Sequence, residues 1–289
     1  VREVEVRPGE VTPIDVTLRR AIDTSGFASG DFHLHSVNSV DSTMSLQRRV
    51  AHVAAEGVDL ACSSDHNFVT DYTQAIAAQG LEDWVQGMVG LEMTTLEVGH
   101  FNGFPLRYDP GPITKGAFEW SGRPPAEVFE DIRALGKYGP DRTVVQVNHP
   151  RDTIQGYFNT YNFNPDTGVP EEDGSLLFSP MGPEFGPENF VETFDALEIV
   201  NGKRRDLLFT YTVPDQLPPP PLPEDVPPAG AVLRDAEGRV AFPGAREDWF
   251  TYLDLGQLYT ATGNSDTHGP GDEPGVPRNF FPVSEERPG

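Results

Sequence analysis

Two histidines in residues 31–35 (DFHLH) are spaced for metal binding. On a β-strand, side chains two residues apart project to the same side, so His33 and His35 point together while Leu34 faces the opposite layer. Two imidazoles that converge on one point suit a divalent metal ion. Taken alone, the pair is a weak signal, because this spacing also arises by chance and a core histidine can simply be hydrogen-bonded.

The other histidines strengthen this signal. The chain has seven histidines, and six of them lie at or beside the ends of expected strands, in polar turns. In a parallel barrel, the carboxyl ends of the strands face one rim, where residues far apart in the sequence converge. The seventh, His52, falls on the polar face of an expected helix and is assigned no role. The other six predict a metal site and are His33, His35, His66, His100, His149 and His268.

Carboxylates accompany these histidines. Asp266 lies two residues before His268 and on the same side, which makes it a strong ligand candidate. Glu92 directly follows an apolar strand and is therefore favoured over Glu97, which we expect to be solvated in a loop. Ligands of these types favour a divalent metal ion.

Two aspartates have more than one interpretation. Asp41 follows His35 by six residues, so it either reaches back to the cluster or forms an acidic first turn of the next helix. Asp65 directly precedes His66, and it either ligates a metal or orients a neighbouring ligand. We include Asp41 among the candidate ligands and Asp65 among the candidate catalytic residues.

Short apolar strands alternate with helices along the chain and would position these side chains. A helix is expected over residues 45–57, with Ser45 as the N-cap and Gly57 as the stop. Further helices are expected over residues 125–137 and 246–255. This alternation predicts a parallel sheet, open or closed. The expected strands are residues 31–35, 58–66, 84–95, 100–106, 143–150, 195–202 and 258–268.

Three segments depart from this alternation. Residues 150–190 are rich in Asn, Gly, Asp, Pro and aromatic side chains, as in a long ordered loop that covers a site. Residues 214–230 are proline-rich and predict a surface insertion. The alternative interpretation is a segment that binds a proline-recognising partner. Residues 1–28 form an expected β appendage, with an exposed strand pair around a Pro-Gly turn. We assign residues 29–289 to one domain.

Composition excludes several classes of partner and site. The formal net charge of −24 disfavours attraction to nucleic acid or to an anionic membrane. The sequence has no apolar run of about 18 residues, so no membrane span is expected. Its single cysteine, Cys62, lies in an apolar run, which predicts a small buried thiol and excludes an internal disulfide or a cysteine-based metal cluster. The oligomeric state stays open.

Five ordered motifs resemble a known family. The motifs DFHLHS, SDHN, GLE followed by GHFN, NHPR and GNSDTH resemble the PHP (polymerase and histidinol phosphatase) superfamily of metal-dependent phosphoesterases, and more closely its carbaryl-hydrolase-like branch. The resemblance covers residues 29 to about 281. It implies a distorted, TIM-like (β/α)7 barrel with two or three metal ions at the rim.

The resemblance also implies how the ligands are divided. One metal ion would be held by His33, His35, Glu92 and Asp266. Glu92 would bridge to a second ion, held also by His100 and His149. A third ion would be held by Asp41, His66 and His268.

This ligand set implies hydrolysis without a protein nucleophile. Histidine and carboxylate ligands suit zinc, manganese or iron, and ligand type alone does not choose among them. Ions that share Glu92 would lower the pKa of a water between them from about 15.7 towards about 7, supplying hydroxide at neutral pH. The hydroxide would attack a phosphorus atom or a carbonyl carbon.

Two arginines lie close to these motifs in the sequence. Arg151 follows His149 by two residues, and Arg278 follows His268 by ten. Either guanidinium could bind a phosphate or carboxylate group of the substrate in a bidentate manner, and Arg278 is slightly favoured. The competing interpretation pairs each arginine with the acidic protein surface.

Three functions are consistent with these features. The first is a phosphoesterase acting on a small phosphomonoester or phosphodiester. The second is a carbamate, ester or amide hydrolase, whose apolar pocket would be built from Phe101, Phe104, Tyr157 and Phe158, although core packing is the commoner role of such residues. The third is a non-catalytic, extracytoplasmic metal-binding or adhesion module. The strand-rich start is typical of the end of a preceding β-domain, so we expect a processed or trimmed, exported protein.

Overall fold

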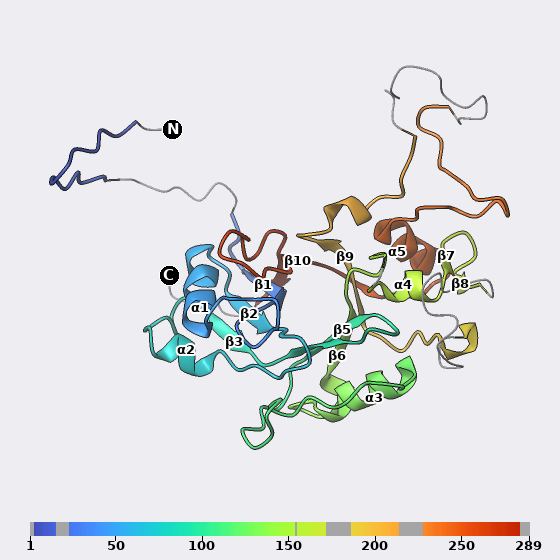
Figure 1. The fold of residues 1–289 in the computed structure, drawn as a ribbon, viewed down its shortest axis with the longest axis horizontal. Coiled ribbons are helices and arrows are strands. Elements are labelled where there is room, and N and C mark those ends of the chain that lie inside the picture. The colour runs from blue at the N-terminus through green and yellow to red at the C-terminus, as the bar shows by residue number, and fades with distance from the viewer. Residues whose placement is uncertain (1–2, 16–22, 154, 172–185, 214–227, 284–289) are drawn as a thin grey trace.

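Two β-sheets carry the candidate ligands (Figure 1). The structure is a computed structural model that describes residues 3–15, 23–153, 155–171, 186–213 and 228–283. The first sheet has the strand order β11-β1-β2-β3, in which β1, β2 and β3 are parallel and β11 is antiparallel to β1. Its strands are β1 (Phe27–Leu34), β2 (Leu60–Ser63), β3 (Gln86–Met88) and β11 (Asn279–Pro282).

The second sheet has the order β10-β9-β6-β5-β4. Strands β6, β9 and β10 are parallel, whereas β5 is antiparallel to both β4 and β6. A separate antiparallel pair is formed by β7 (Phe163–Asn164) and β8 (Val169–Pro170). The strands of the second sheet are β4 (Leu91–Thr94), β5 (His100–Phe104), β6 (Val144–Val147), β9 (Ala196–Asn201) and β10 (Thr260–Asn264).

The described residues form a mixed α/β fold, as expected, but contain no closed barrel, and the antiparallel strands β5 and β11 depart from the expected parallel sheet. Isolated parallel bridges, Leu34 with Thr267 and His66 with Glu92, nevertheless join the ends of the two sheets. Because β5 runs antiparallel, its first residue, His100, pairs with Thr94 at the end of β4. The amino end of β5 therefore lies at the same edge as the carboxyl ends of its neighbours.

The single strand expected over residues 84–95 is divided between the two sheets, as β3 and β4. Gly90 lies at the crossing, where a Cβ atom would be 2.5 Å from the carbonyl oxygen of Ser63 and 2.9 Å from that of Gly103. Real Cβ contacts are not this short, so the crossing requires a glycine. The close approach brings Glu92, two residues later, towards the strand ends of the first sheet.

The helices cover the outer faces of the two sheets (Figure 1). The helix predicted from residue 45 is confirmed as α1 (Leu46–Ala55), whose N-cap Ser45 accepts a hydrogen bond from the backbone N–H of Arg48. The helix expected over residues 246–255 is confirmed as α5 (Ala245–Asp254), and α3 (Pro125–Ala134) ends three residues earlier than expected. Shorter helices are α2 (Thr73–Ala77), α4 (Tyr157–Thr160), and the 3-10 turns η1 (Pro140–Arg142), η3 (Pro187–Asn189) and η4 (Arg205–Leu207).

Two buried apolar clusters hold these layers together. One packs α1 and α2 on the first sheet through residues such as Val50, Val53 and Ile76. The larger one lies against the second sheet and contains Phe101, Tyr157 and Phe158. Phe104 is also buried and stacks on Phe32, with ring centroids 5.1 Å apart. These four aromatic residues therefore build the core and do not form a substrate pocket.

Other expectations have mixed outcomes. Residues 3–15 contain the expected turn, in which Glu10 N–H donates to the carbonyl of Arg7, but no strand pair. Most of the proline-rich insertion (214–227) and part of the long loop (154 and 172–185) lie outside the described residues. Cys62 is a buried free thiol, as expected. None of the helices in the described ranges is long and apolar enough to cross a membrane.

Candidate metal centre

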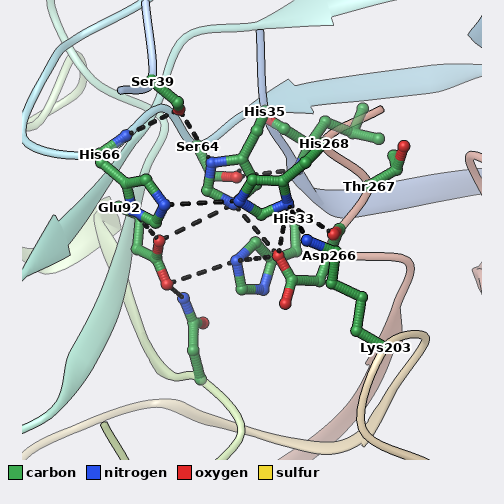
Figure 2. A network of polar contacts seen from close by, with 12 residues as sticks. His33, His35, Ser39, Ser64, His66, Glu92, Lys203, Asp266, Thr267 and His268 are labelled. Atoms are coloured by element: carbon green, nitrogen blue, oxygen red, sulfur yellow. Dashed lines mark hydrogen bonds and ion pairs between the residues drawn. The ribbon is translucent and has the colours of Figure 1, made fainter. Parts of the chain in front are cut away.

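The six predicted histidines converge where the two sheets meet. Figure 2 shows four of them, His33, His35, His66 and His268. His33 lies one residue before the end of β1 and His35 directly follows the strand, while Glu92 and His100 lie on β4 and β5. The remaining members lie in the turns after β2, β6 and β10, and are His66, His149, Asp266 and His268. Strand ends of both sheets thus supply every candidate except Asp41, which lies in the loop before α1.

Four groups of three side chains have ligand atoms within 4.8 Å of one another. Each group is large enough to begin a metal coordination shell. Several residues occur in two groups, so neighbouring ions would share ligands. The groups are His35, His66 and His268; His33, His35 and Glu92; His33, His149 and Asp266; and Glu92, His100 and His149.

Glu92 lies at the centre of the cluster. Its Oε1 is 3.3 Å from Nε2 of His33 and 3.2 Å from Nδ1 of His100. Its Oε2 is 2.6 Å from Nδ1 of His66. Asn148 donates a hydrogen bond of 2.8 Å to Oε1 and holds the fully buried carboxylate in place. A carboxylate whose two oxygens face different histidines is suited to bridge two ions.

Two aspartates also lie within the cluster and contact its histidines. Oδ1 of Asp266 is 3.4 Å from Nε2 of His33 and 3.2 Å from Nε2 of His35. The half-exposed Asp41 is 3.4 Å from Nε2 of His66 and 3.2 Å from Nε2 of His268. The first turn of α1 contains no acid. Of the two interpretations of Asp41, the structure therefore favours the one that places it in the cluster.

Unpaired ring nitrogens provide an independent test of whether the residues fit a metal. Six buried histidine ring nitrogens have no hydrogen-bond partner within the described part of the chain, and five of them belong to the cluster, the sixth being Nδ1 of His52 on α1. Burying a polar atom without a partner is costly, so such atoms are rare in folded proteins. Metal ions would satisfy them, and the residues present therefore fit the group. The five are Nε2 of His33, Nε2 of His35, both ring nitrogens of His100, and Nδ1 of His149.

Hydrogen bonds set which nitrogen of His35 faces the cluster. Ser39 Oγ donates its one proton to Oδ1 of Asp65, at 2.7 Å, and lies 3.0 Å from Nδ1 of His35. Because that proton is already used, Ser39 Oγ accepts from the Nδ1–H of His35. The lone pair of Nε2 is then left to face Asp266. Partners of this kind fix the tautomer and ring orientation of metal-binding histidines.

Asp65 is buried behind this relay and does not line the cleft. Besides Ser39, its carboxylate accepts hydrogen bonds from the backbone N–H and Oγ of Ser36 and from Oγ1 of Thr70. These contacts occupy both carboxylate oxygens. Its position corresponds to the second expected role, orientation of a neighbouring ligand, and not to direct contact with a substrate.

Both arginines contact protein groups and neither is among the residues that line the cleft, so the structure does not support the expectation that they bind a substrate. Arg151 is buried and donates to both carboxylate oxygens of Asp248, at 2.7 and 2.5 Å. Arg278 donates to the carbonyl oxygens of Gly275 and Glu56, at 2.8 and 3.0 Å. Glu56 is the C-cap of α1, where unpaired carbonyls attract a cation.

Two residues that were not among the predicted candidates also contact the cluster. Glu198, within the apolar strand β9, is buried and lies 2.9 Å from Nδ1 of His33. Glu198 could have been predicted from the sequence, because a glutamate in or next to an apolar strand is the same pattern that identified Glu92. Lys203 follows the end of β9 by two residues, and its Nζ lies 2.6 Å from Nδ1 of His268.

The electrostatics of the cluster favour added positive charge. Burial lowers the pKa of His66, but the Glu92 and Asp41 carboxylates oppose it and raise the pKa to about 10. Burial raises the pKa of Glu92, but His100, His66 and His33 hold it well below its usual value. Without a metal, the carboxylates therefore favour the protonated forms of His33, His66 and His149, whose pKa values are raised, whereas burial lowers the pKa values of His35, His100 and His268. Metal ions would compete for the same positions.

The cluster forms the floor of an open cleft with a volume of about 570 Å³. Apolar side chains on its walls are Val40, Leu96 and Trp120, and cationic side chains are Lys203 and Arg204. The polar residues of the walls are Asn67, Thr94, Asp152 and Gln155. The long loop expected to cover the site supplies Asp152 and Gln155 to this lining.

Comparison with known proteins adds distant structural likenesses. No protein-family model matches the chain, and no curated protein matches it in sequence. A two-domain protein from Bacteroides vulgatus, containing a predicted PHP-like metal-dependent phosphoesterase, is similar in structure, with a TM-score of 0.46 and 17% identity. That match covers 90% of this chain and 58% of the other, so this chain spans less than two thirds of it.

Two further solved structures are similar at comparable levels. A putative metal-dependent phosphoesterase from Bifidobacterium adolescentis has a TM-score of 0.40 and 15% identity, covering 88% of this chain and 92% of that one. Endonuclease Q, in a complex with a 27-mer duplex bearing an abasic lesion, has a TM-score of 0.46 and 12% identity, covering 90% of this chain and 54% of that one. None of the three is described as a carbaryl hydrolase, so that narrower branch stays a prediction.

Proposed function

We propose that this protein is a hydrolase that depends on divalent metal ions and acts on phosphate esters. The observation that carries the proposal is the convergence of His33, His35, His100 and His149 on Glu92, with buried ring nitrogens that have no hydrogen-bond partner in the described residues. A structural metal is usually enclosed by four protein ligands. Here the ligand groups overlap and open onto a cleft, as a catalytic site requires.

The chain's own residues would hold and orient the reacting groups. Metal ions bound here would polarise the substrate and lower the pKa of a water molecule. Glu92 would tie the neighbouring ligand groups together, and the relay from Asp65 through Ser39 keeps His35 in one tautomer. In the hydrolysis, water oxygen forms a bond to phosphorus, the bond to the ester oxygen breaks, and the proton released by water balances the one taken up by the leaving oxygen.

A carbamate, ester or amide substrate is the second candidate, and one observation favours it. Val40, Leu96 and Trp120 place apolar surface on the walls of the cleft, where an aryl group would lose its contact with water. The same set of ligands would serve attack on a carbonyl carbon.

The test is activity against a substrate panel after controlled metal loading. The protein is stripped with a chelator and reloaded with Zn²⁺, Mn²⁺ or Fe²⁺. It is then assayed with p-nitrophenyl phosphate, bis(p-nitrophenyl) phosphate and 1-naphthyl N-methylcarbamate. We expect metal-dependent cleavage of a phosphate ester, abolished in a His33→Ala/His35→Ala variant and retained in His52→Gln, because His52 lies on α1 outside every ligand group.

Each other outcome has a defined meaning. Cleavage of the carbamate alone would replace phosphoester hydrolysis with the second candidate. Stoichiometric metal binding without hydrolysis of any substrate would favour a non-catalytic metal-binding module. Failure to bind any of the three ions would refute the proposal.

A further inference from the structure

Lys203 is a cation beside the metal centre whose role the ligand set does not explain. The chain has three lysines, Lys115, Lys137 and Lys203, and the last lines the cleft. Figure 2 shows its side chain next to Asp266 and His268. Its Nζ lies 2.6 Å from Nδ1 of His268.

Lys203 differs from its neighbour in its partners. Arg204, the other cationic residue of the cleft walls, forms ion pairs with Asp152 and Asp206. The ammonium of Lys203 has no carboxylate partner within ion-pair distance among the described residues. In a chain with a formal net charge of −24, Lys203 is the lysine that lies next to the acidic cluster.

The contact with His268 is incompatible with His268 acting as a ligand. Nδ1 of His268 lies 2.6 Å from the Lys203 ammonium and 2.9 Å from the carbonyl oxygen of Asp266. Nε2 is the nitrogen that faces Asp41 and His66. When Nε2 ligates a metal, the single proton of the neutral ring is on Nδ1, where it can donate to the Asp266 carbonyl. Nδ1 then no longer accepts a hydrogen bond from Lys203.

Charge then determines what Lys203 can bind. An ammonium group near bound divalent ions is repelled by them, and the repulsion is strong where water is partly excluded. An anionic group placed between the ions and Lys203 would be attracted to the ions and to the ammonium, and would offset the repulsion between them. The exposed position of Lys203 at the cleft leaves room for such a group to enter from solvent.

We propose that Lys203 binds an anionic oxygen of the substrate, so that the cleft selects anionic esters over neutral ones. This inference rests on the proposed function, since it assumes a substrate that reacts at the metal centre. It names the substrate class by charge and makes Lys203 a specificity-determining residue. Arg204, held by two aspartates, is not assigned this role.

The kinetic test compares Lys203→Met and Lys203→Arg with a matched control, Lys137→Met, which removes an exposed lysine outside the cleft. Loss of one charged hydrogen bond predicts that KM for a phosphate ester rises about 10- to 100-fold in Lys203→Met. Lys203→Arg retains the charge and should recover part of the loss. Hydrolysis of a neutral carbamate, where measurable, and the metal content should not change. A drop in metal content, or an equal rise in KM for the neutral substrate, would contradict the proposal.

A second measurement does not need turnover. With only three lysines, reductive methylation followed by peptide mass spectrometry reports each amine separately. We expect inorganic phosphate to slow the modification of Lys203 in the metal-loaded protein, while Lys137 reacts at the same rate. Equal rates with and without phosphate would overturn the proposal. If the wild-type protein hydrolyses nothing, the proposed function fails, yet the labelling still decides whether Lys203 binds an anion.

Discussion

His33 and Glu198 form a fully buried pair, in which Nδ1 of the imidazole lies 2.9 Å from Oε1 of the carboxylate. Oε2 of Glu198 accepts hydrogen bonds from the backbone N–H of His149 and from Nδ2 of Asn201. The pair fixes the imidazole so that Nε2 points at Glu92 and Asp266. One glutamate on β9 therefore orients candidate ligands from two different sheet ends.

Replacing Glu198 with glutamine should weaken metal binding. Loss of a carboxylate partner of a ligating histidine typically reduces metal affinity about 10- to 100-fold. We expect Glu198→Gln to lower affinity by this amount, measured by competition with a chromogenic chelator. Glu130→Gln, an exposed position on α3, is the control. An unchanged affinity in Glu198→Gln would show that His33 does not need this partner.

Metal uptake at pH 7 should release protons. The pKa of His66 in the metal-free protein is raised to about 10, so at pH 7 its imidazole is protonated, whereas a ligand must be neutral. Apparent metal affinity should therefore rise as the pH increases and fall in acid. Calorimetric titration in two buffers with different ionisation enthalpies measures the number of protons released. His66→Asn should release fewer protons than the wild type, and His52→Gln the same number.

The ligands could be predicted from the sequence because their placement follows local rules. Side chains two residues apart share a face of a strand, and polar residues at strand ends gather at one edge of a sheet. His33 with His35 follows both rules, whereas Asp266 and His268 lie beyond the end of β10 and follow only the second, and the structure brings all four into the cluster. His100 begins its strand, and it reaches the cluster only because β5 runs antiparallel to its neighbours.

The sheet arrangement and the cation partners could not be predicted in this way. Buried apolar strands look alike whether they pair in parallel or antiparallel, so nothing in residues 100–106 marks β5 as antiparallel. The partner of Arg151 is Asp248, which lies 97 residues away on α5. Sequence proximity to a metal motif therefore did not indicate what a guanidinium contacts.

Arg49 should position candidate ligands through hydrogen bonds to the backbone beside them. Its buried side chain donates from Nε to the carbonyl of His35, at 2.7 Å, and from its terminal nitrogens to Oγ1 and the carbonyl of Thr267, at 2.8 and 3.1 Å. It thus joins the turns after β1 and β10. Each buried carbonyl left without a donor costs about 1–3 kcal/mol.

We therefore expect Arg49→Met to lower the free energy of unfolding of the metal-free protein and also to reduce metal affinity, while the exposed neighbour Arg48→Met does neither. Urea denaturation and metal titration measure the two effects. A loss of stability with unchanged metal affinity would assign Arg49 to the fold alone.

Arg278→Ala should lower the stability of the protein without changing catalysis. Arg278 donates to the carbonyls of Glu56 and Gly57 at the end of α1 and is not part of the cleft lining. A cation at a helix C-terminus contributes about 0.3–1 kcal/mol. We expect a loss of stability of this order in thermal denaturation, with KM for the preferred substrate unchanged. A large rise in KM with unchanged stability would contradict this prediction and place Arg278 at the substrate.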